Sequence, residues 1–408
     1  MGDKMLFNKL GDVSQHERKN LKLLLIIGGL YTLGIYLSNV FVNIYLWKQS
    51  GEISVLAVYN LFIYVTQTLI FILIGRFVKR IDRVIILRLG ILIISIFFIT
   101  VFLLSTNAAK YHYFLGIIIG TGYGLFWLAY NILVFEITEP PTRDYFNSKF
   151  GALQSLSGMI GPMSAGAIIS ALEGQIGYLI IFFTSFLLFI FAIIMSSFLD
   201  RRTAEGAYFI REVINERKNN KRWFYLLNAH FFQGIREGVF LFLVGIWVFM
   251  MTNSEWVIGV YNLIYALSSF IGYQICAKFV TPINRRVFIL TGTIFLYVSV
   301  FWLLIADKAL DFYIYSAAIG LFLPLFFSPY TSVSYDVIGQ AYNARDYRIE
   351  YIILRDITLN LGRIVSLLTF LLGLFIFNEP LWIKYGLLLY GFGYIVSGYF
   401  IHLITKNN

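Results

Sequence analysis

Charged residues are scarce in this 408-residue sequence. They make up 13% of the chain, whereas roughly 25% is typical of a soluble domain. Hydrophobic residues make up 59%, and the mean hydropathy is +0.76. Apolar runs of about 20 residues recur along the chain, and each can cross a bilayer as an α-helix. A membrane β-barrel would instead show alternating segments of about ten residues. The sequence therefore predicts an all-α polytopic membrane protein.

Cysteine and histidine are almost absent. The one cysteine, Cys276, lies inside an apolar run, so no intramolecular disulfide can form. The histidines (His16, His112, His230 and His402) show no metal-ligand spacing. No G-x₄-GK-[ST] motif is present, so ATP bound to this chain would not drive transport. No catalytic acids are paired at a membrane surface. We therefore expect no metal, no cofactor and no enzymatic activity.

Twelve membrane spans are predicted. They lie at 21–46, 53–75, 84–104, 112–134, 147–170, 178–199, 223–250, 256–277, 287–306, 312–334, 350–376 and 382–404. The tails and every second loop hold 26 of the 32 Lys and Arg residues, and the opposite loops hold four. This asymmetry predicts that both termini lie in the cytoplasm, and we expect the protein in the plasma membrane. It also accounts for the net charge of +10 without a nucleic-acid partner.

The two halves of the chain are an approximate duplication. The motif VYNL occurs at 58–61 and at 260–263, and Arg-Asp-Tyr occurs at 143–145 and at 345–347, both with an offset of 202. Repeats of this kind are typical of transporters. The predicted organisation is a cytoplasmic tail (1–20), a six-helix bundle (21–199), a cytoplasmic linker (200–222) and a second bundle with a short tail (223–408). Within the linker, Ala207–Lys218 has helical spacing and either lies on the membrane surface or is solvated.

This organisation resembles the major facilitator superfamily, from Leu21 to Ile404. That family has twelve helices as six plus six, a polar central linker, and a basic loop after helix 2 that is repeated after helix 8. Its loop typically reads G-x-x-x-D-R-x-G-R-(R/K). Here Gly75–Arg83 keeps the first glycine, an arginine and the last arginine, but Lys79 replaces the aspartate and Asp82 stands where the second glycine belongs.

Two further motifs support the resemblance. The segment from Glu136 to Arg143 matches the E-x₆-R that follows helix 4 in the family. In helix 5, a motif partly resembles the glycine-proline signature of the family's antiporters. Its residues are Gly158, Gly161, Pro162 and Gly166.

The charges in these loops predict a cytoplasmic gate. Charge pairs that close in one state and break in the other would make that side bistable. The alternative is that the basic residues only set the topology. The predicted gate consists of Gly75, Arg76, Asp82, Arg83, Glu136, Arg143, Arg285, Asp336 and Arg345.

Three charges are predicted to lie deep in the membrane. Arg236 and Glu237 are about 13 residues into helix 7, a depth of ~20 Å, and Arg363 is about as deep in helix 11. Such charges are costly unless they pair or face water. They form either a buried structural pair, such as Glu237 with Arg363, or part of a transport cavity. The resemblance implies a cavity lined by helices 1, 4, 7 and 10. With the deep arginine of helix 11, its predicted residues are Asn39, Asn43, Tyr130, Asn131, Gln233, Arg236, Glu237, Tyr330 and Arg363.

The resemblance implies a secondary transporter that works by alternating access. The helix 5 motif favours proton-coupled export of a small or amphipathic solute, with Glu237, or less favourably Asp356, carrying the proton. A transporter or flippase for an anionic or glycosylated lipid or an organophosphate is an alternative, as is a scaffold or sensor without flux. The expected partners are a small-molecule or lipid-like substrate, protons and membrane lipids, and the protein is expected to be a monomer.

Overall fold

The computed structural model describes residues 15–137, 140–172, 175–200 and 207–406, and these residues form helices joined by short loops. The first half comprises α2 (Gln15–Ser50), α3 (Ile53–Gly75), α4 (Arg83–Leu104), the 3-10 helix η1 (Ser105–Tyr111), α5 (His112–Ile137), α6 (Pro140–Ala171) and α7 (Ile176–Ser196). The linker contains α8 (Ile210–Asn219). The second half comprises α9 (Lys221–Thr252), α10 (Glu255–Phe279), α11 (Arg285–Ile305), α12 (Ala309–Gly339), α13 (Ala344–Ile376), α14 (Glu379–Gly391) and α15 (Gly393–Lys406).

The helices account for twelve membrane crossings in the described part of the chain. Eleven apolar helical segments are long enough to span a bilayer, and one of them runs from Arg83 to Val134. A straight helix of 52 residues would be ~78 Å long, more than twice the ~30 Å of a hydrocarbon core. The turn at η1 divides this segment into α4 and α5. The all-α fold with twelve spans, the last made of α14 and α15, is therefore confirmed.

Local sequence signals set several helix ends. The side-chain oxygen of Asp82 accepts a hydrogen bond from the backbone N–H of Val84 (2.9 Å) and caps α4. Asn220 caps α9 in the same way through Trp223 N–H (3.1 Å). Asn253 ends α9 in the left-handed conformation (φ 48°), which asparagine tolerates better than most residues. These caps satisfy backbone groups that a helix end leaves unpaired.

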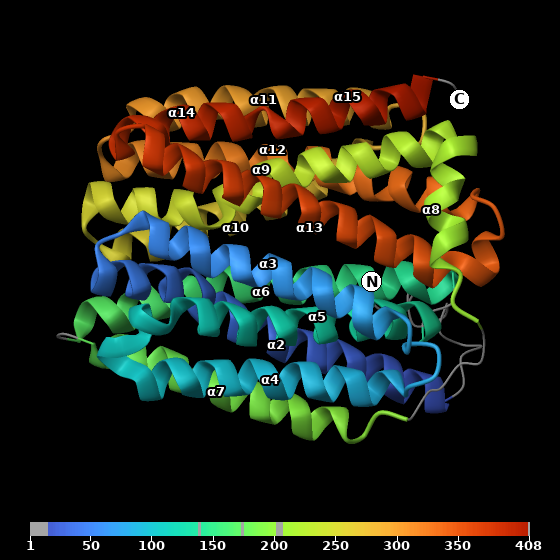
Figure 1. The fold of residues 1–408 in the computed structure, drawn as a ribbon, viewed down its shortest axis with the longest axis horizontal. Coiled ribbons are helices and arrows are strands. Elements are labelled where there is room, and N and C mark those ends of the chain that lie inside the picture. Colours follow the sequence, from blue (N-terminus) through green and yellow to red (C-terminus); the bar gives the residue numbers. More distant parts are fainter. Residues whose placement is uncertain (1–14, 138–139, 173–174, 201–206, 407–408) are drawn as a thin grey trace.

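Figure 1 shows the two halves as separate layers of helices, with α2–α7 on one side and α9–α15 on the other. They meet along two helix pairs, α3 with α13 and α6 with α10. The linker helix α8 stands at one end of the molecule and packs on α13 and α9. Val213 of α8 is fully buried, and its carbonyl accepts a hydrogen bond from the indole N–H of Trp223 (3.1 Å). The linker helix thus begins three residues later than expected and makes contact with protein.

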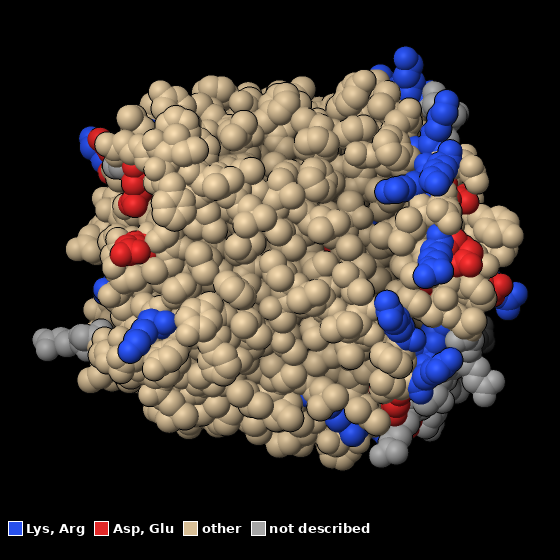
Figure 2. All heavy atoms as spheres, in the orientation of Figure 1, with Lys and Arg blue, Asp and Glu red and all other residues tan. Residues whose placement is uncertain are grey.

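Basic residues gather at the end of the molecule that carries α8 (Figure 2). We call this the basic end; it contains the loops 76–82, 197–200, 280–284 and 340–343. The far end contains η1 and the loops 51–52, 253–254 and 306–308. Each helix therefore has a known direction: α6 and α13 begin at the basic end, and α10 and α12 finish there.

Candidate functional site

A cavity of about 1120 Å³ lies between the two bundles. Its walls come from α5 and α6 of the first half and from α10, α12 and α13 of the second. The lining includes Thr281, Pro282 and Arg285, which belong to the basic end, and it reaches Tyr36 and Tyr265 in the middle of their helices. The cavity therefore runs from the interior of the molecule toward the basic end.

At the far end a contact joins the two bundles, and we call it the Glu255 latch (Lys48, Tyr178 and Glu255). Lys48 Nζ lies 2.7 Å from Glu255 Oε1, and the Tyr178 hydroxyl donates to the same oxygen (2.8 Å). Lys48 and Tyr178 come from the first half, whereas Glu255 begins α10 in the second. Beside them, Trp47 packs edge-on against Phe249 with ring centroids 5.6 Å apart. The latch thus joins the two bundles at the far end.

A second inter-bundle contact, the Lys79 latch (Lys79, Ala207, Phe209 and Glu350), lies at the basic end on the α3–α13 side. Lys79 Nζ lies 2.7 Å from Glu350 Oε1 and donates to the carbonyls of Ala207 (2.9 Å) and Asp346 (3.3 Å). The same Glu350 oxygen accepts the backbone N–H of Phe209 (3.1 Å). The side chains of Lys79 and Glu350 are 9% and 0% exposed. One buried ion pair therefore holds the α3–α4 loop, the linker and α13 together.

Gly75 gives this latch its space. A Cβ at Gly75 would lie 3.1 Å from the hydroxyl of Tyr208 and 3.2 Å from a methyl carbon of Ile353. Burial, followed by the negative charge of Glu350, raises the pKa of Tyr208 to about 12. The Tyr208 hydroxyl therefore stays protonated at neutral pH beside the latch.

The predicted gate residues form two matching ties, but each tie lies inside one bundle. Arg83 at the start of α4 lies 3.2 Å from Glu136 on α5. Arg285 at the start of α11 lies 2.7 Å from Asp336 on α12. The two pairs are related by the internal repeat of the sequence. They tie neighbouring helices, whereas the contact between bundles uses Lys79 and Glu350, which the sequence analysis did not assign to the gate.

The remaining predicted gate residues are Gly75, which lies beside the Lys79 latch, and four charged residues. Asp82 caps α4, and Arg76 and Arg345 are exposed. The side chain of Arg143 lies outside the described residues. The sequence did contain a signal for the missed pair. Lys79 puts a positive charge where the family motif has a negative one, and Glu350 places an acid near the start of helix 11.

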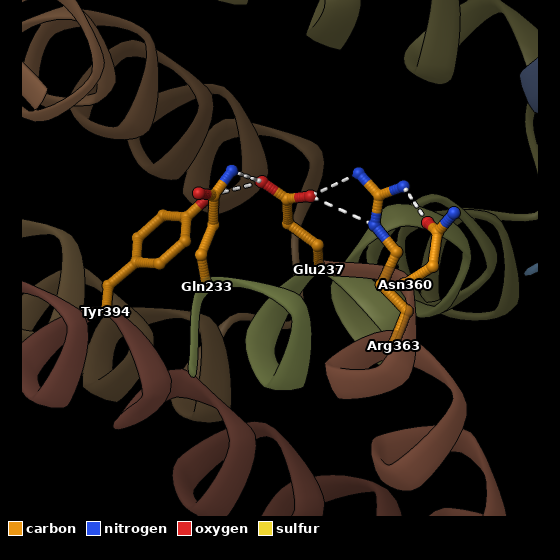
Figure 3. A network of polar contacts seen from close by, with 5 residues as sticks. All are labelled: Gln233, Glu237, Asn360, Arg363 and Tyr394. Atoms are coloured by element: carbon orange, nitrogen blue, oxygen red, sulfur yellow. Dashed lines mark hydrogen bonds and ion pairs between the residues drawn. The ribbon is translucent and has the colours of Figure 1, made fainter. Parts of the chain in front are cut away.

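Deep in the second bundle, Glu237 is the centre of a polar network (Figure 3). Its Oε2 accepts from Arg363 Nη2 (2.5 Å) and Nε (3.2 Å). Its Oε1 accepts from the amide of Gln233 (2.8 Å) and the hydroxyl of Tyr394 (3.3 Å). Arg363 also donates to Asn360 Oδ1 (2.9 Å). The carboxylate is therefore fully engaged as an acceptor and its charge is balanced by Arg363.

Glycines bring these groups together. A Cβ at Gly234 of α9 would overlap the carbonyl of Leu359, and one at Gly362 of α13 would overlap the carbonyl of Phe231. The two helices can approach closely only because these side chains are absent. Glu237 lies about one turn after Gly234, and Arg363 directly follows Gly362. The close approach of the two helices therefore brings Glu237 and Arg363 together. The guanidinium of Arg363 also lies 4.9 Å from the ring centroid of Tyr64 on α3, so the network borders the other bundle.

Of the nine predicted cavity residues, all of which the structure describes, Asn131 lines this cavity. Gln233, Glu237 and Arg363 belong to the buried network. The guanidinium of Arg236 lies between the rings of Phe240 and Tyr394, 4.3 and 4.2 Å from their centroids. The remaining four lie in helix contacts: Asn43 accepts from Asn60, Asn39 accepts from Tyr123, Tyr130 stacks on Phe126, and Tyr330 packs against Phe326.

The sequence analysis missed most of the lining. Arg348, Ile352 and Arg355 on α13 line the cavity at positions i, i+4 and i+7, which share one helix face. Asp356, the second predicted proton carrier, is bound to its neighbour Arg355, with Nη2 and Oδ1 2.8 Å apart. The periodicity of polar residues on helix 11 was the available signal for this face.

The helix 5 motif lies at two close helix crossings. A Cβ at Gly161 would lie 2.9 Å from the backbone nitrogen of Leu37 on α2, and one at Gly166 would lie 2.8 Å from the carbonyl of Glu255 on α10. Gly158 lines the cavity, and Pro162 lies inside α6. The motif therefore lets α6 pack closely against α2 of its own bundle and against α10 of the other. A link between this motif and antiport stays a prediction.

Comparisons with known proteins agree with this architecture. The model of the Major Facilitator Superfamily matches residues 24–347. The chain is 46% identical over 392 residues to "Uncharacterized protein YqgE" of Bacillus subtilis (strain 168), an alignment that covers 96% of this chain and 91% of the relative. It is 54% identical over 176 residues to "Uncharacterized protein in sodM 3'region" of Geobacillus stearothermophilus, covering 43% of this chain and 82% of that one.

Proposed function

Because this chain belongs to the major facilitator superfamily, a family of membrane transporters, we propose that it is a secondary active transporter that works by alternating access. The observation that supports this most directly is the asymmetry between its two ends. The cavity between the bundles reaches the basic end, and the Glu255 latch joins the bundles at the far end. In an alternating-access cycle this arrangement is one of two states, and breaking the latch leads to the other.

We also propose that transport is proton-coupled export, with Glu237 as the proton carrier and Asp356 as the alternative. Every polar contact of Glu237 described above comes from a donor, so both carboxylate oxygens act as acceptors in this state. A proton on Oε2 would compete with Arg363 for that oxygen. Protonation would therefore release Arg363, whose guanidinium lies against Tyr64 of the other bundle, and couple the proton to bundle movement.

The proposed location is the plasma membrane, with both termini and α8 in the cytoplasm. A Glu212→Cys reporter on the exposed face of α8, in a Cys276→Ser background, should react with a membrane-impermeant maleimide only after the membrane is opened. A Lys308→Cys reporter at the far end is the control and should react in intact cells. Labelling of the α8 reporter in intact cells would reverse the proposed topology.

Alternating access is tested by weakening the Glu255 latch. Glu255→Gln removes the charge that holds Lys48 and should raise the population of the state open at the far end. Because Lys48 is 42% exposed, the pair is worth less than about 1 kcal/mol, or roughly a two- to fivefold shift. A Ser332→Cys reporter in the cavity should react more slowly from the basic end, and a Val40→Cys reporter between α2 and α9 should react faster from the far end.

The control for this experiment is Glu52→Gln, which neutralises an exposed acid at the same end outside the latch. It should leave both reporters unchanged. If Glu255→Gln changes neither labelling rate in a folded protein, the latch does not separate two states, and the proposal of alternating access loses its main support.

A further inference from the structure

The lining of the cavity is basic. Three arginines, Arg285, Arg348 and Arg355, line it, and the residues described as its lining include no carboxylate. Asp336, which pairs with Arg285, and Asp356, which pairs with Arg355, are not among these lining residues. Guanidinium groups in the wall of a narrow, low-dielectric cleft offer charged hydrogen-bond donors to an anion, because charges there are weakly screened.

Two of these arginines can act on one ligand. Arg348 and Arg355 are two turns apart on one face of α13, so their Cα atoms are ~10 Å apart along the helix, and both side chains reach the cavity. Asp356 engages only Nε and Nη2 of Arg355, through the single oxygen Oδ1. A guanidinium has five N–H donors, so Arg355 keeps donors for a second acceptor. Three hydroxyl-bearing residues of α12 line the same cavity: Thr331, Ser332 and Tyr335.

The inner part of the cavity has the opposite character. Tyr36 and Tyr265, each well inside its helix, line it together with Ala266 and Gly158. Phe270 and Phe327 also line the cavity and add aromatic surface. The volume of about 1120 Å³ is slightly above the roughly 300–1,000 Å³ typical of small-molecule sites. The cavity thus has a basic, hydroxyl-rich part toward the basic end and an aromatic part in the interior.

We propose that this cavity binds an organic anion with an apolar body, its anionic group on Arg348 and Arg355 and its apolar part against Tyr36 and Tyr265. A phosphate, sulfate or carboxylate head would meet both guanidinium groups in charge-assisted hydrogen bonds. The inference names the substrate class of the proposed transporter and rests on that function only for movement of the ligand, since binding can be measured without flux.

The test uses purified protein in nanodiscs of zwitterionic phosphatidylcholine and three octyl compounds that share one tail. Octyl phosphate should raise the unfolding temperature in a saturable way. Octyl glucoside and octyltrimethylammonium should have no saturable effect at the same concentrations. Inorganic phosphate, the head without the tail, should bind at least tenfold more weakly than octyl phosphate.

The variants assign the site. Arg348→Gln should weaken octyl phosphate binding about tenfold or more, the effect of losing one charged hydrogen bond, and Arg348→Lys should retain part of it. Arg286→Gln, an exposed neighbour of Arg285 outside the lining, is the control and should bind as the wild type does. The unfolding temperature of each variant without ligand shows whether it is folded.

Three results would overturn the proposal: equal saturable stabilisation by the cationic octyl compound, equal affinity for phosphate alone, or unchanged octyl phosphate binding in a folded Arg348→Gln variant. Transport is a separate measurement. If octyl phosphate binds at Arg348 but shows no counterflow in proteoliposomes with any organic anion, the binding site stands and the proposed transport function fails. If a cationic solute is transported and octyl phosphate does not bind, transport stands and this inference fails.

Discussion

Glu237→Gln is expected to abolish flux driven by a pH gradient and to lower the stability of the protein. The substitution removes the group proposed to carry the proton and leaves Arg363 buried without its counter-charge. Breaking a buried pair by removing one partner costs about 3–5 kcal/mol, and the 17% exposure of Arg363 places the expected loss at the lower end. Substrate exchange, which needs no net proton movement, should persist in the folded fraction.

The double variant Glu237→Gln with Arg363→Met separates the two effects. It removes both charges and should recover most of the lost unfolding temperature, because no unpaired charge remains. Under the proton-carrier proposal it should still lack pH-driven flux. Glu379→Gln, an exposed acid at the start of α14, is the control and should behave as the wild type in both assays. Recovery of pH-driven flux in the double variant would exclude Glu237 as the proton carrier and leave it with a structural role as the partner of Arg363.

Lys79→Glu is expected to open the basic end on the α3–α13 side. It places a second carboxylate beside Glu350 and leaves the carbonyls of Ala207 and Asp346 without the donor they have now. Loss of a fully buried pair of this kind costs about 3–5 kcal/mol. Spin labels at Ser197 and Tyr342, exposed positions in the two halves of the basic end, should report a longer distance in the variant.

The charge swap tests whether the pair itself is responsible. Glu350→Lys alone should have the same effect as Lys79→Glu, and the double swap should restore part of the short distance. Restoration is partial because the N–H of Phe209 and the carbonyl of Ala207 are matched to the present polarity. Arg80→Glu, on the exposed face of the same loop, is the control. An unchanged distance in both single variants would exclude the Lys79 latch as a contact that holds the bundles together.

The Lys79 latch also explains the departure of this chain from the loop motif that it resembles. The family's usual aspartate is replaced here by Lys79, and Glu350 provides the opposite charge on α13. The contact between this loop and the eleventh helix therefore has its cation on the loop and its anion on α13, and it joins the two bundles. A substitution at either position changes the charge balance of a buried site, so the two residues act as a unit.

Sequence alone determined the fold class and the number of spans. A helix in a bilayer must satisfy every backbone polar group within itself, so runs of about 20 apolar residues predict crossings with little ambiguity, and only η1 was needed to separate α4 from α5. The internal repeat also indicated that Arg83, Glu136, Arg285 and Asp336 belong to the gate. The pairs Arg83–Glu136 and Arg285–Asp336 match because neighbouring helices pack in the same way in each half. Because buried charges require a partner or water, the sequence left two alternatives for Glu237 and Arg363: a buried pair or part of a transport cavity.

The tertiary structure alone decided which residues face the cavity and which pair joins the bundles. Tyr130 and Asn131 are adjacent in sequence, yet Tyr130 stacks on Phe126 inside the bundle and Asn131 lines the cavity. In a membrane helix the lipid-facing and protein-facing sides are both apolar, so hydrophobic periodicity does not reveal the orientation that it shows in soluble helices. Lys79 and Glu350 are 271 residues apart. Their contact depends on how two separately folded bundles dock, and no local spacing in the chain records that geometry.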